Sequence, residues 1–279
     1  MERRIKQQVQ GSPAIDGAGV HLVRVLGHHT VEEYDPFLML DSFDSRRPED
    51  YTAGFPLHPH RGIETISFLS SGSMTHRDSL GNEDTVSDGE VQWMTAGSGI
   101  MHEEKLPAGP RMLGLQLWLN MPAKDKMAKP NYHAIKREDV QEIPIEGGKL
   151  RLLAGEYEGR EGYRGHYQPL DYYDILLDAG ASITLNVPID NSAFVFTLLG
   201  DAVVAGTSVR EKTAVLTTPG DTLTLSAGNA PVELVFASSR RLDEPAYWRG
   251  PIVMSTQEDL NQAFKDLREG TFLKEEVAY

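Results

Sequence analysis

Short runs in which apolar and polar residues alternate, separated by turns rich in glycine and proline, follow one another along most of the 279-residue chain. In residues 111–121, every second position from 113 to 119 is leucine, while Gln116 and Trp118 share the opposite face. Alternation with a period of two is typical of a β-strand with two different faces. Turns recur roughly every 8 to 15 residues, a spacing typical of sandwiches and barrels. The pattern therefore predicts an all-β protein.

Residues 122–148 interrupt this pattern, because they are charged, contain three prolines and carry few large apolar side chains. The segment is predicted to connect two units and to hold one short helix near residues 136–140. We therefore divide the chain into an N-terminal domain, residues 1–134, and a C-terminal domain, residues 135–279.

The two predicted domains share the same order of predicted elements in one part of their sequences. Residues 71–99 and residues 200–228 each read as a hairpin, a turn, and a strand opened by a glycine next to an acidic residue. Two tandem copies of one β fold would explain this internal similarity.

The last part of the chain changes to helical spacing. Ser255 and Glu258 are three residues apart and are predicted to form a capping box at the start of a helix. Gly270 is expected to end this helix. The apolar residues that recur between them are Leu260, Ala263, Phe264 and Leu267. We expect the chain to close with one amphipathic helix that packs on a sheet.

The net charge of the chain is −14, which disfavours partners with a phosphate backbone or an anionic lipid surface. Direct binding to nucleic acid or to a membrane is therefore not expected. The first residues are basic but no apolar core follows them, and no run approaches 18 apolar residues. Neither a signal peptide nor a membrane span is predicted, and a cytoplasmic location is the expectation.

The chain contains no cysteine, so any bound metal must be held by nitrogen and oxygen ligands. His58 and His60 are two residues apart and point to the same face of a strand; Glu64 shares this parity if the strand is unbroken. His102 and Glu104 form a second pair, expected on another strand. Three imidazoles and one carboxylate suit Fe(II), Mn, Ni, Cu or Zn. On spacing alone Glu64 is the carboxylate ligand, although Glu104 offers a second oxygen donor.

Several other candidates receive simpler interpretations. His76 alternates with apolar neighbours and is interpreted as an ordinary strand residue. Trp93 and Trp118 are interpreted as core residues, with a place close to the metal as the alternative for Trp93. Arg61 directly follows the paired histidines and is expected to pair with a carboxylate.

Several blocks of this sequence resemble a known family. HPHRGIET occupies residues 58–65, QWMTAGSGIMHEE residues 92–104, and GLQLW residues 114–118. DPFLMLDSF at residues 35–43 and GPIVMSTQEDLNQAF at residues 250–264 extend the match. Together they resemble the pirin family of the cupin superfamily over nearly the whole chain. The resemblance implies two tandem cupin barrels of the jelly-roll type, packed face to face.

Carried over by motif, the resemblance implies one metal in the N-terminal domain, with His58, His60, His102 and Glu104 as its ligands. Glu64 then keeps a supporting role, such as holding a histidine ring. Iron, as Fe(II), is the expected cofactor, with Mn, Ni, Cu and Zn as alternatives. The C-terminal domain lacks paired histidines, so we expect it to bind no metal and to be structural or to form one wall of the pocket.

The resemblance implies functions of two classes. Some pirins are credited with 2,3-dioxygenase cleavage of the flavonol quercetin, and in such a reaction Glu104 is the catalytic proton acceptor. Others are described as redox-sensing regulators, which would bind a transcription factor or a metabolic enzyme. A metal-binding cupin without catalysis is a third hypothesis. An apolar cavity large enough for an aromatic substrate would favour the enzyme, which we rank first, and we expect a monomer.

Overall fold

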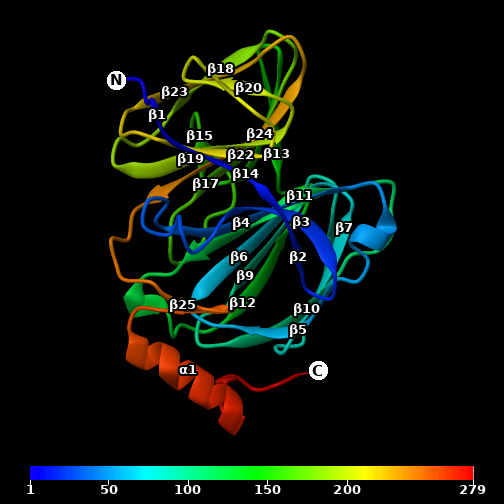
Figure 1. Cartoon of the computed structure of the whole chain (residues 1–279), viewed down its shortest axis with the longest axis vertical. Coiled ribbons are helices and arrows are strands. Elements are labelled where there is room, and N and C mark those ends of the chain that lie inside the picture. The colour runs from blue at the N-terminus through cyan, green and yellow to red at the C-terminus, as the bar shows by residue number, and fades with distance from the viewer. Residues whose placement is uncertain (279) are drawn as a thin grey trace.

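The computed structural model describes residues 1–278, which fold mainly into β-strands with one α-helix near the C-terminal end (Figure 1). The strands build two bodies, one above the other in Figure 1, and each combines a seven-stranded sheet with a four-stranded sheet. Two antiparallel sheets wrapped around one interior are the architecture of a jelly-roll barrel. The prediction of an all-β protein with two barrels and a C-terminal helix is confirmed.

The N-terminal barrel is the lower body in Figure 1. Its large sheet contains, in order, β12 (Asn131–Ile135), β9 (Val91–Thr95), β6 (Ile63–Ser71), β11 (Met112–Asn120), β4 (Phe37–Ser45), β3 (Val20–Leu26) and β2 (Ser12–Asp16). Its small sheet contains β5 (Phe55–His60), β10 (Ile100–Lys105), β7 (Ser73–Asp78) and β8 (Glu83–Ser87). Two short 3₁₀ helices, η1 (Pro48–Asp50) and η2 (Ala123–Asp125), lie in its loops.

The C-terminal barrel is the upper body. Its large sheet contains, in order, β1 (Ile5–Gln10), β22 (Thr213–Thr217), β19 (Asn191–Leu199), β24 (Val232–Arg240), β17 (Asp171–Leu177), β14 (Gly148–Ala154) and β13 (Gln141–Ile145). Its small sheet contains β18 (Ser182–Asn186), β23 (Thr222–Ala227), β20 (Ala202–Val204) and β21 (Thr207–Val209). The hairpin of β15 (Glu156–Tyr157) and β16 (Arg160–Glu161) extends from it.

The two large sheets pack against each other and bury a shared apolar core. The leucine face of β11, residues 113 to 119, is buried in this core together with Phe194 and Phe196 of β19. The opposite face of β11 carries Gln116 and Trp118 and points into its own barrel. The alternation along this strand thus separates a side that joins the barrels from a side that lines a cavity, and the face-to-face packing is confirmed.

Each end of the chain joins the barrel that the other end builds. Residues 5–10 form β1, which pairs with β22 and completes the large sheet of the C-terminal barrel. After that barrel the chain, orange in Figure 1, runs back and forms β25 (Tyr247–Arg249), β26 (Ile252–Met254) and α1 (Gln257–Glu269) on the N-terminal barrel. Because the ends cross over, the division at residues 134 and 135 stays a prediction.

We call residues 247–272 the C-terminal strap, and a buried arginine fastens it. The guanidinium of Arg61 donates hydrogen bonds to Asp266 at 2.8 Å and to the backbone carbonyl oxygen of Phe272 at 2.7 Å. It also lies 4.2 Å from the centre of the Phe272 ring. Asp266 is therefore the carboxylate partner expected for Arg61.

The predicted connection between the barrels contains strands instead of a helix. β12 pairs with β9 of the N-terminal barrel, and β13 pairs with β14 of the C-terminal barrel. Between them, the backbone N–H groups of Asp139 and Val140 donate to the carbonyl oxygen of Lys136 and form a turn. The prediction of a short helix near residues 136–140 is therefore wrong. The charged residues of this segment alternate with buried residues on two edge strands.

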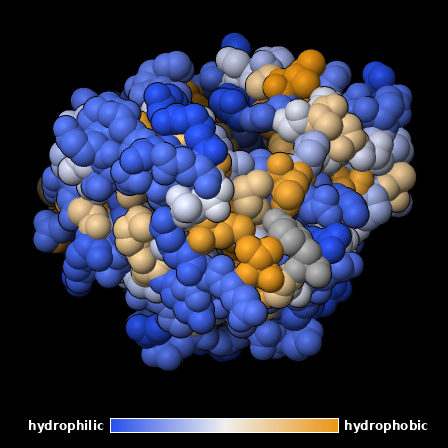
Figure 2. All heavy atoms as spheres, turned by 90° about the horizontal axis from the view of Figure 1, so that it is seen from below, coloured by the Kyte–Doolittle hydropathy of each residue, from blue (hydrophilic) through white to orange (hydrophobic). Residues whose placement is uncertain are grey.

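The helix α1 begins at a cap one residue later than predicted. Thr256 is the N-cap, and its side-chain oxygen accepts a hydrogen bond from the backbone N–H of Asp259 at 3.0 Å. Gly270, with φ 71°, ends the helix as expected. The face that carries α1 is largely hydrophilic, with apolar atoms near its centre (Figure 2). Within residues 1–278, no helix has the length and apolar character needed to cross a bilayer.

Candidate metal centre

His58 and His60 lie on β5, and His102 lies on the neighbouring strand β10, directly opposite His58. The Nε2 atoms of His58 and His60 are 3.1 Å apart. Among residues 1–278, these three histidines form the group whose candidate ligand atoms all lie within 4.8 Å of one another. Strand pairing in the small sheet thus brings the two histidine motifs together.

Backbone carbonyl groups hold the other ring nitrogen of two of these histidines. Nδ1 of His58 is 2.8 Å from the carbonyl oxygen of Pro56, and Nδ1 of His60 is 2.9 Å from that of Pro251 in the C-terminal strap. A carbonyl oxygen only accepts hydrogen bonds, so each Nδ1 carries a hydrogen. In the neutral form of such a ring, the free lone pair is on Nε2.

His102 is fully buried, and its Nε2 has no hydrogen-bond partner within the described part of the chain. Burial, and then the nearby histidines, lowers the pKa of His102; burial and His58 likewise lower the pKa of His60. Both rings are neutral at neutral pH, the form that coordinates a metal. A buried nitrogen without a partner, beside two further lone pairs, fits a divalent transition metal.

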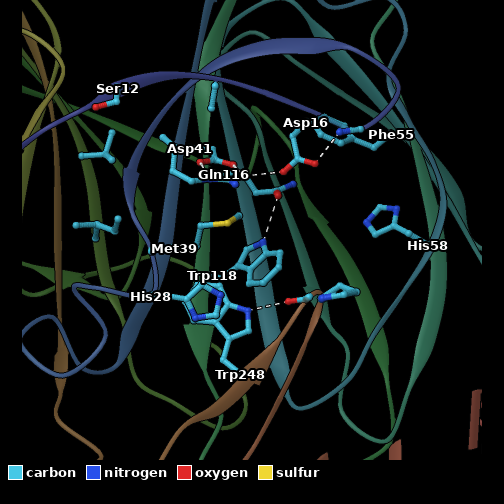
Figure 3. Close-up of a pocket in the computed structure, with 18 of the residues that line it drawn as sticks. Ser12, Asp16, His28, Met39, Asp41, Phe55, His58, Gln116, Trp118 and Trp248 are labelled. Carbon is cyan, nitrogen blue, oxygen red and sulfur yellow. Dashed lines mark hydrogen bonds and ion pairs between the residues drawn. The ribbon is translucent and has the colours of Figure 1, made fainter. Parts of the chain in front are cut away.

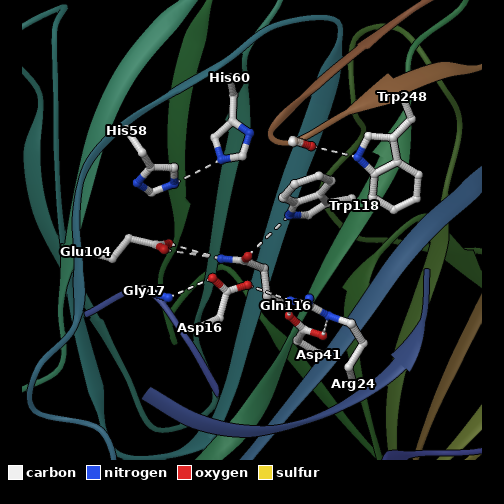
Figure 4. Close-up of polar contacts among 11 residues, drawn as sticks. Asp16, Gly17, Arg24, Asp41, His58, His60, Glu104, Gln116, Trp118 and Trp248 are labelled. Carbon is white, nitrogen blue, oxygen red and sulfur yellow. Dashed lines mark hydrogen bonds and ion pairs between the residues drawn. The ribbon is translucent and has the colours of Figure 1, made fainter. Parts of the chain in front are cut away.

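Glu104 follows two residues after His102 on β10, and its side chain is buried beside the histidines (Figure 4). Gln92 donates a hydrogen bond to its Oε1 at 2.6 Å, and Gln116 donates to both of its oxygens at 3.3 Å. The carboxylate is thus oriented by two amides, although it is not part of the close histidine group. The adjacent Glu103 is partly exposed on the other face.

Glu64 lies on a different sheet from the histidines. β5 ends at His60, and Gly62, with φ +78°, turns the chain into β6 of the large sheet. The carboxylate of Glu64 accepts hydrogen bonds from Nε1 of Trp93 at 3.0 Å and Oγ1 of Thr95 at 2.7 Å. Burial raises its pKa. The strand is therefore broken between His60 and Glu64, so the condition for their shared parity is not met, and the partners of Glu64 are Trp93 and Thr95 instead of a histidine ring.

Two further polar residues, which the sequence interpretation did not assign to this site, lie next to the histidines. Nδ1 of His76 is 3.3 Å from Nδ1 of His102, and its Nε2 is 2.8 Å from Oδ2 of Asp78. Both His76 and Asp78 are fully buried on β7, next to β10. Their two-residue spacing in a strand is the signal that could have placed them on one inward face.

A cavity of about 860 Å³ opens beside the histidines and is lined by His58, His60 and Glu104, among others. Aromatic rings form one wall, which Figure 3 shows. The ring of Trp118 meets His60 edge-on, with centroids 5.0 Å apart, and His28 stacks on Trp248 at 3.9 Å. The cavity has the size of small-molecule sites, which are about 300–1,000 Å³.

Charged groups occupy another side of the cavity (Figure 4). Arg24 donates to both carboxylate oxygens of Asp41, at 2.9 Å and 2.7 Å, and to Asp16 at 2.6 Å. Such a two-point pairing fixes the plane of the guanidinium. The cavity thus offers an apolar aromatic wall together with a rigid polar side.

The C-terminal barrel shows no comparable group among the described residues, since the histidine set lies in the N-terminal barrel. His133 is on the edge strand β12 and stacks on Tyr163 at 4.6 Å. The chain beyond the second barrel does reach the cavity, because Trp248 and Pro251 of the C-terminal strap line it.

Comparisons with known proteins agree with this architecture. A family model described as "Pirin" matches residues 19–119, and one described as "Pirin C-terminal cupin domain" matches residues 172–273. A Pseudomonas aeruginosa protein named "Putative quercetin 2,3-dioxygenase" is 42% identical over 272 residues, which cover 93% of this chain and 94% of that protein. Human "Pirin" is 33% identical over 276 residues, covering 95% and 92% of the two chains.

Among solved structures, the chain is similar to a crystal structure of quercetin 2,3-dioxygenase from Acinetobacter baumannii. The TM-score is 0.90 at 31% sequence identity, and the match covers 98% of this chain and 99% of the other. Similarity of this extent includes both barrels and the strap. The chain therefore belongs to the pirin family, whose two domains are cupin barrels.

Proposed function

We propose that this protein is a metal-dependent dioxygenase that acts on flavonol-like aromatic molecules. The observation that carries the proposal is the 860 Å³ cavity, which combines an aromatic wall with access to His58, His60 and Glu104. A planar molecule of two or three rings fits such a volume, whereas a sensor needs no large cavity beside its metal. Relatives that bear the quercetin 2,3-dioxygenase name support the same substrate class.

His58, His60 and His102 are proposed as metal ligands through their Nε2 atoms, with Glu104 as the fourth ligand. Fe(II) is the proposed metal, because three imidazoles and a carboxylate suit it and leave coordination positions open. When bound, it would supply the redox chemistry that brings dioxygen and an electron-rich ring together.

Glu104 is also proposed as the base that accepts the proton of the substrate hydroxyl. Its carboxylate lines the cavity, so a hydroxyl placed against the histidines lies within reach of it. Gln92 and Gln116 hold the carboxylate in place through hydrogen bonds, which lowers the entropy lost when the substrate binds.

The remaining walls are proposed to orient the substrate. Trp118 and Trp248 present aromatic surface on one side, and Met39 adds a flexible apolar contact. The Arg24–Asp41 pair on the other side can hydrogen-bond the hydroxyl groups of a polyphenol. A flat, hydroxylated aromatic molecule satisfies both sides at once.

Oxygen uptake with quercetin and Fe(II) tests the proposal. The wild type should consume oxygen, and Glu104→Gln should be slower by about 10²–10⁴-fold, the usual contribution of a general base. Glu103→Gln is the matched control, because Glu103 is adjacent in sequence but lies on the opposite face, and it should retain full activity. Iron content measured on each variant separates loss of the base from loss of the metal.

Three results would count against the enzyme. No oxygen uptake by iron-loaded wild type with a panel of flavonols would reject catalysis and favour the regulatory alternative. Equal rates for Glu104→Gln and wild type would reject the base. Equal losses in Glu103→Gln and Glu104→Gln would show that the effect is not specific to the cavity.

A further inference from the structure

A continuous row of buried polar groups runs from the histidine cluster into the wall of the N-terminal barrel. It begins at His102 on β10, passes to His76 and ends at Asp78, both on β7. All three side chains are fully buried. A row of this kind, closed off from water, must have one consistent arrangement of protons.

The far end of the row determines which atom carries the hydrogen between His76 and Asp78. Oδ1 of Asp78 accepts hydrogen bonds from the backbone N–H of Leu80 at 2.9 Å and of Asn82 at 3.2 Å. The side-chain amide of Asn82 donates to both carboxylate oxygens, at 3.1 Å and 2.9 Å. With donors on every side, Asp78 is an acceptor, so Nε2 of His76 must carry the hydrogen between them.

The position of the hydrogen on His76 in turn determines the tautomer of His102. A neutral His76 with its hydrogen on Nε2 presents a lone pair at Nδ1, which can only accept a hydrogen bond. The neighbouring Nδ1 of His102, 3.3 Å away, must then carry a hydrogen and donate it. The Nε2 of His102 is left with a free lone pair, and this is the buried atom that has no partner among residues 1–278.

The opposite arrangement would block the site. If His76 carried hydrogens on both nitrogens, Nδ1 of His102 would have to accept, and its own hydrogen would move to Nε2. That N–H would point at His58 and His60 and leave no lone pair there for a metal. Tyr132 stacks on His76 with ring centroids 4.1 Å apart and 10° between the planes, which holds the ring in the orientation the row needs.

We propose that Asp78 and His76 are positioning residues that fix the tautomer of His102 so that its Nε2 faces the metal. The inference rests on the proposed metal centre. Groups that hold a metal-binding histidine in this way typically contribute about 10–100-fold to metal affinity. The carboxylate of Asp78 does not contact His102 directly. The imidazole of His76 lies between them, so Asp78 acts on the tautomer of His102 through His76.

Substitution of His76 separates the polar role from a packing role. Gln can accept from His102 through its oxygen and donate to Asp78 through its nitrogen, whereas Leu fills a similar volume without polar atoms. We expect His76→Gln to bind Zn(II) within a few-fold of wild type and His76→Leu to bind about 10–100-fold more weakly. The dissociation constants are measured by competition with a chelator, and thermal unfolding of the metal-free proteins controls for folding.

Nitrogen NMR of the wild type needs no substitution and reads the tautomers directly in the zinc-loaded protein. Hydrogens on Nε2 of His76 and Nδ1 of His102 support the proposal; a hydrogen on Nδ1 of His76 overturns it. Equal affinities of the two His76 variants, whether both strong or both weak, also overturn it. If wild type itself fails to bind Zn(II), the metal centre is rejected, and with it this role.

Discussion

The small sheets of the two barrels share one strand layout but have opposite interiors. In the N-terminal barrel, the inward positions of β5, β10 and β7 carry histidines and acids around a cavity. In the C-terminal barrel, the inward positions of β18, β23 and β20 are filled by hydrocarbon, in Ile183, Leu185, Leu223, Leu225 and Val204. The same scaffold thus holds either a closely packed apolar interior or a hollow one lined by polar groups.

The largest expected contrast is in metal binding. His102→Leu replaces a proposed ligand at the centre of the cluster. The new side chain is a leucine, the residue type that fills the interior of the C-terminal barrel. We expect this variant to lose its metal entirely, whereas His133→Leu, an exposed edge-strand histidine, should bind as wild type does. Elemental analysis of proteins loaded with Zn(II) checks this, and full occupancy of the His102 variant would contradict the ligand set.

The two interiors should also differ in how much the truncation of a side chain lowers the free energy of unfolding. Leu225→Ala opens a void in a closely packed barrel and should lower the free energy of unfolding by about 3–5 kcal/mol. His102→Ala, measured without metal, removes a buried imidazole next to the cavity-lining His58 and His60, and should lower the free energy of unfolding by less. Urea denaturation of both metal-free variants compares them; equal costs would mean that the N-terminal barrel is as tightly packed as its partner.

The Arg61–Asp266 pair joins the C-terminal strap to the N-terminal barrel. It should contribute less to the free energy of unfolding than the side chain of Leu225 does. Asp266→Asn weakens a charged hydrogen bond and should cost about 1.5–3 kcal/mol of unfolding free energy, against a negligible effect of the exposed Glu269→Gln. A similar loss in both variants would show that the pair adds nothing beyond general helix charge.

This contribution has a defined pH range. Burial by itself raises the pKa of Asp266, but its hydrogen-bond donors, Arg61 foremost, lower the value to about 2, below the ordinary value of 3.8. A carboxylate with a lowered pKa stabilises the folded protein above its unfolded pKa and stops doing so as it becomes protonated. The difference between wild type and Asp266→Asn should therefore be complete above about pH 4 and shrink between pH 4 and 2.

The smallest expected effect concerns the aromatic wall of the cavity. Trp248→Ala removes one stacking surface and should raise the KM for a flavonol about tenfold, equivalent to about 1.4 kcal/mol, with little change in kcat. Tyr247→Ala is the matched control, because Tyr247 is exposed and adjacent. Steady-state oxygen uptake measures both, and an unchanged KM in the Trp248 variant would remove this residue from the proposed substrate site.

The local periodicity of the chain was enough to predict much of this structure. The alternation in residues 111–121 correctly separated a buried leucine face from the face of Gln116 and Trp118, and Gly270 correctly ended the helix. The paired spacing of His58 and His60 placed both rings on one side of β5. These features depend on neighbours within a few residues, which a sequence shows directly.

Features that depend on distant parts of the chain were not predictable in this way. The parity of Glu64 was predicted for an unbroken strand, but Gly62 turns the chain into another sheet, and a parity count does not hold across such a turn. The contact of His76 with His102 requires the register of β7 against β10, and the pairing of β1 with β22 joins residues 5–10 to residues 213–217. Sequence pattern alone specifies none of these alignments.

The position of Pro251 has a consequence for how the protein is made. Its carbonyl oxygen fixes the ring of His60, yet almost two hundred residues separate the two along the chain, so the ribosome adds this partner long after the histidine has emerged. A nascent chain that already contains the whole N-terminal barrel still lacks Pro251, Asp266 and the rest of the strap. Assembly of the histidine cluster in its final geometry must therefore wait until residue 251 and the rest of the strap have been made.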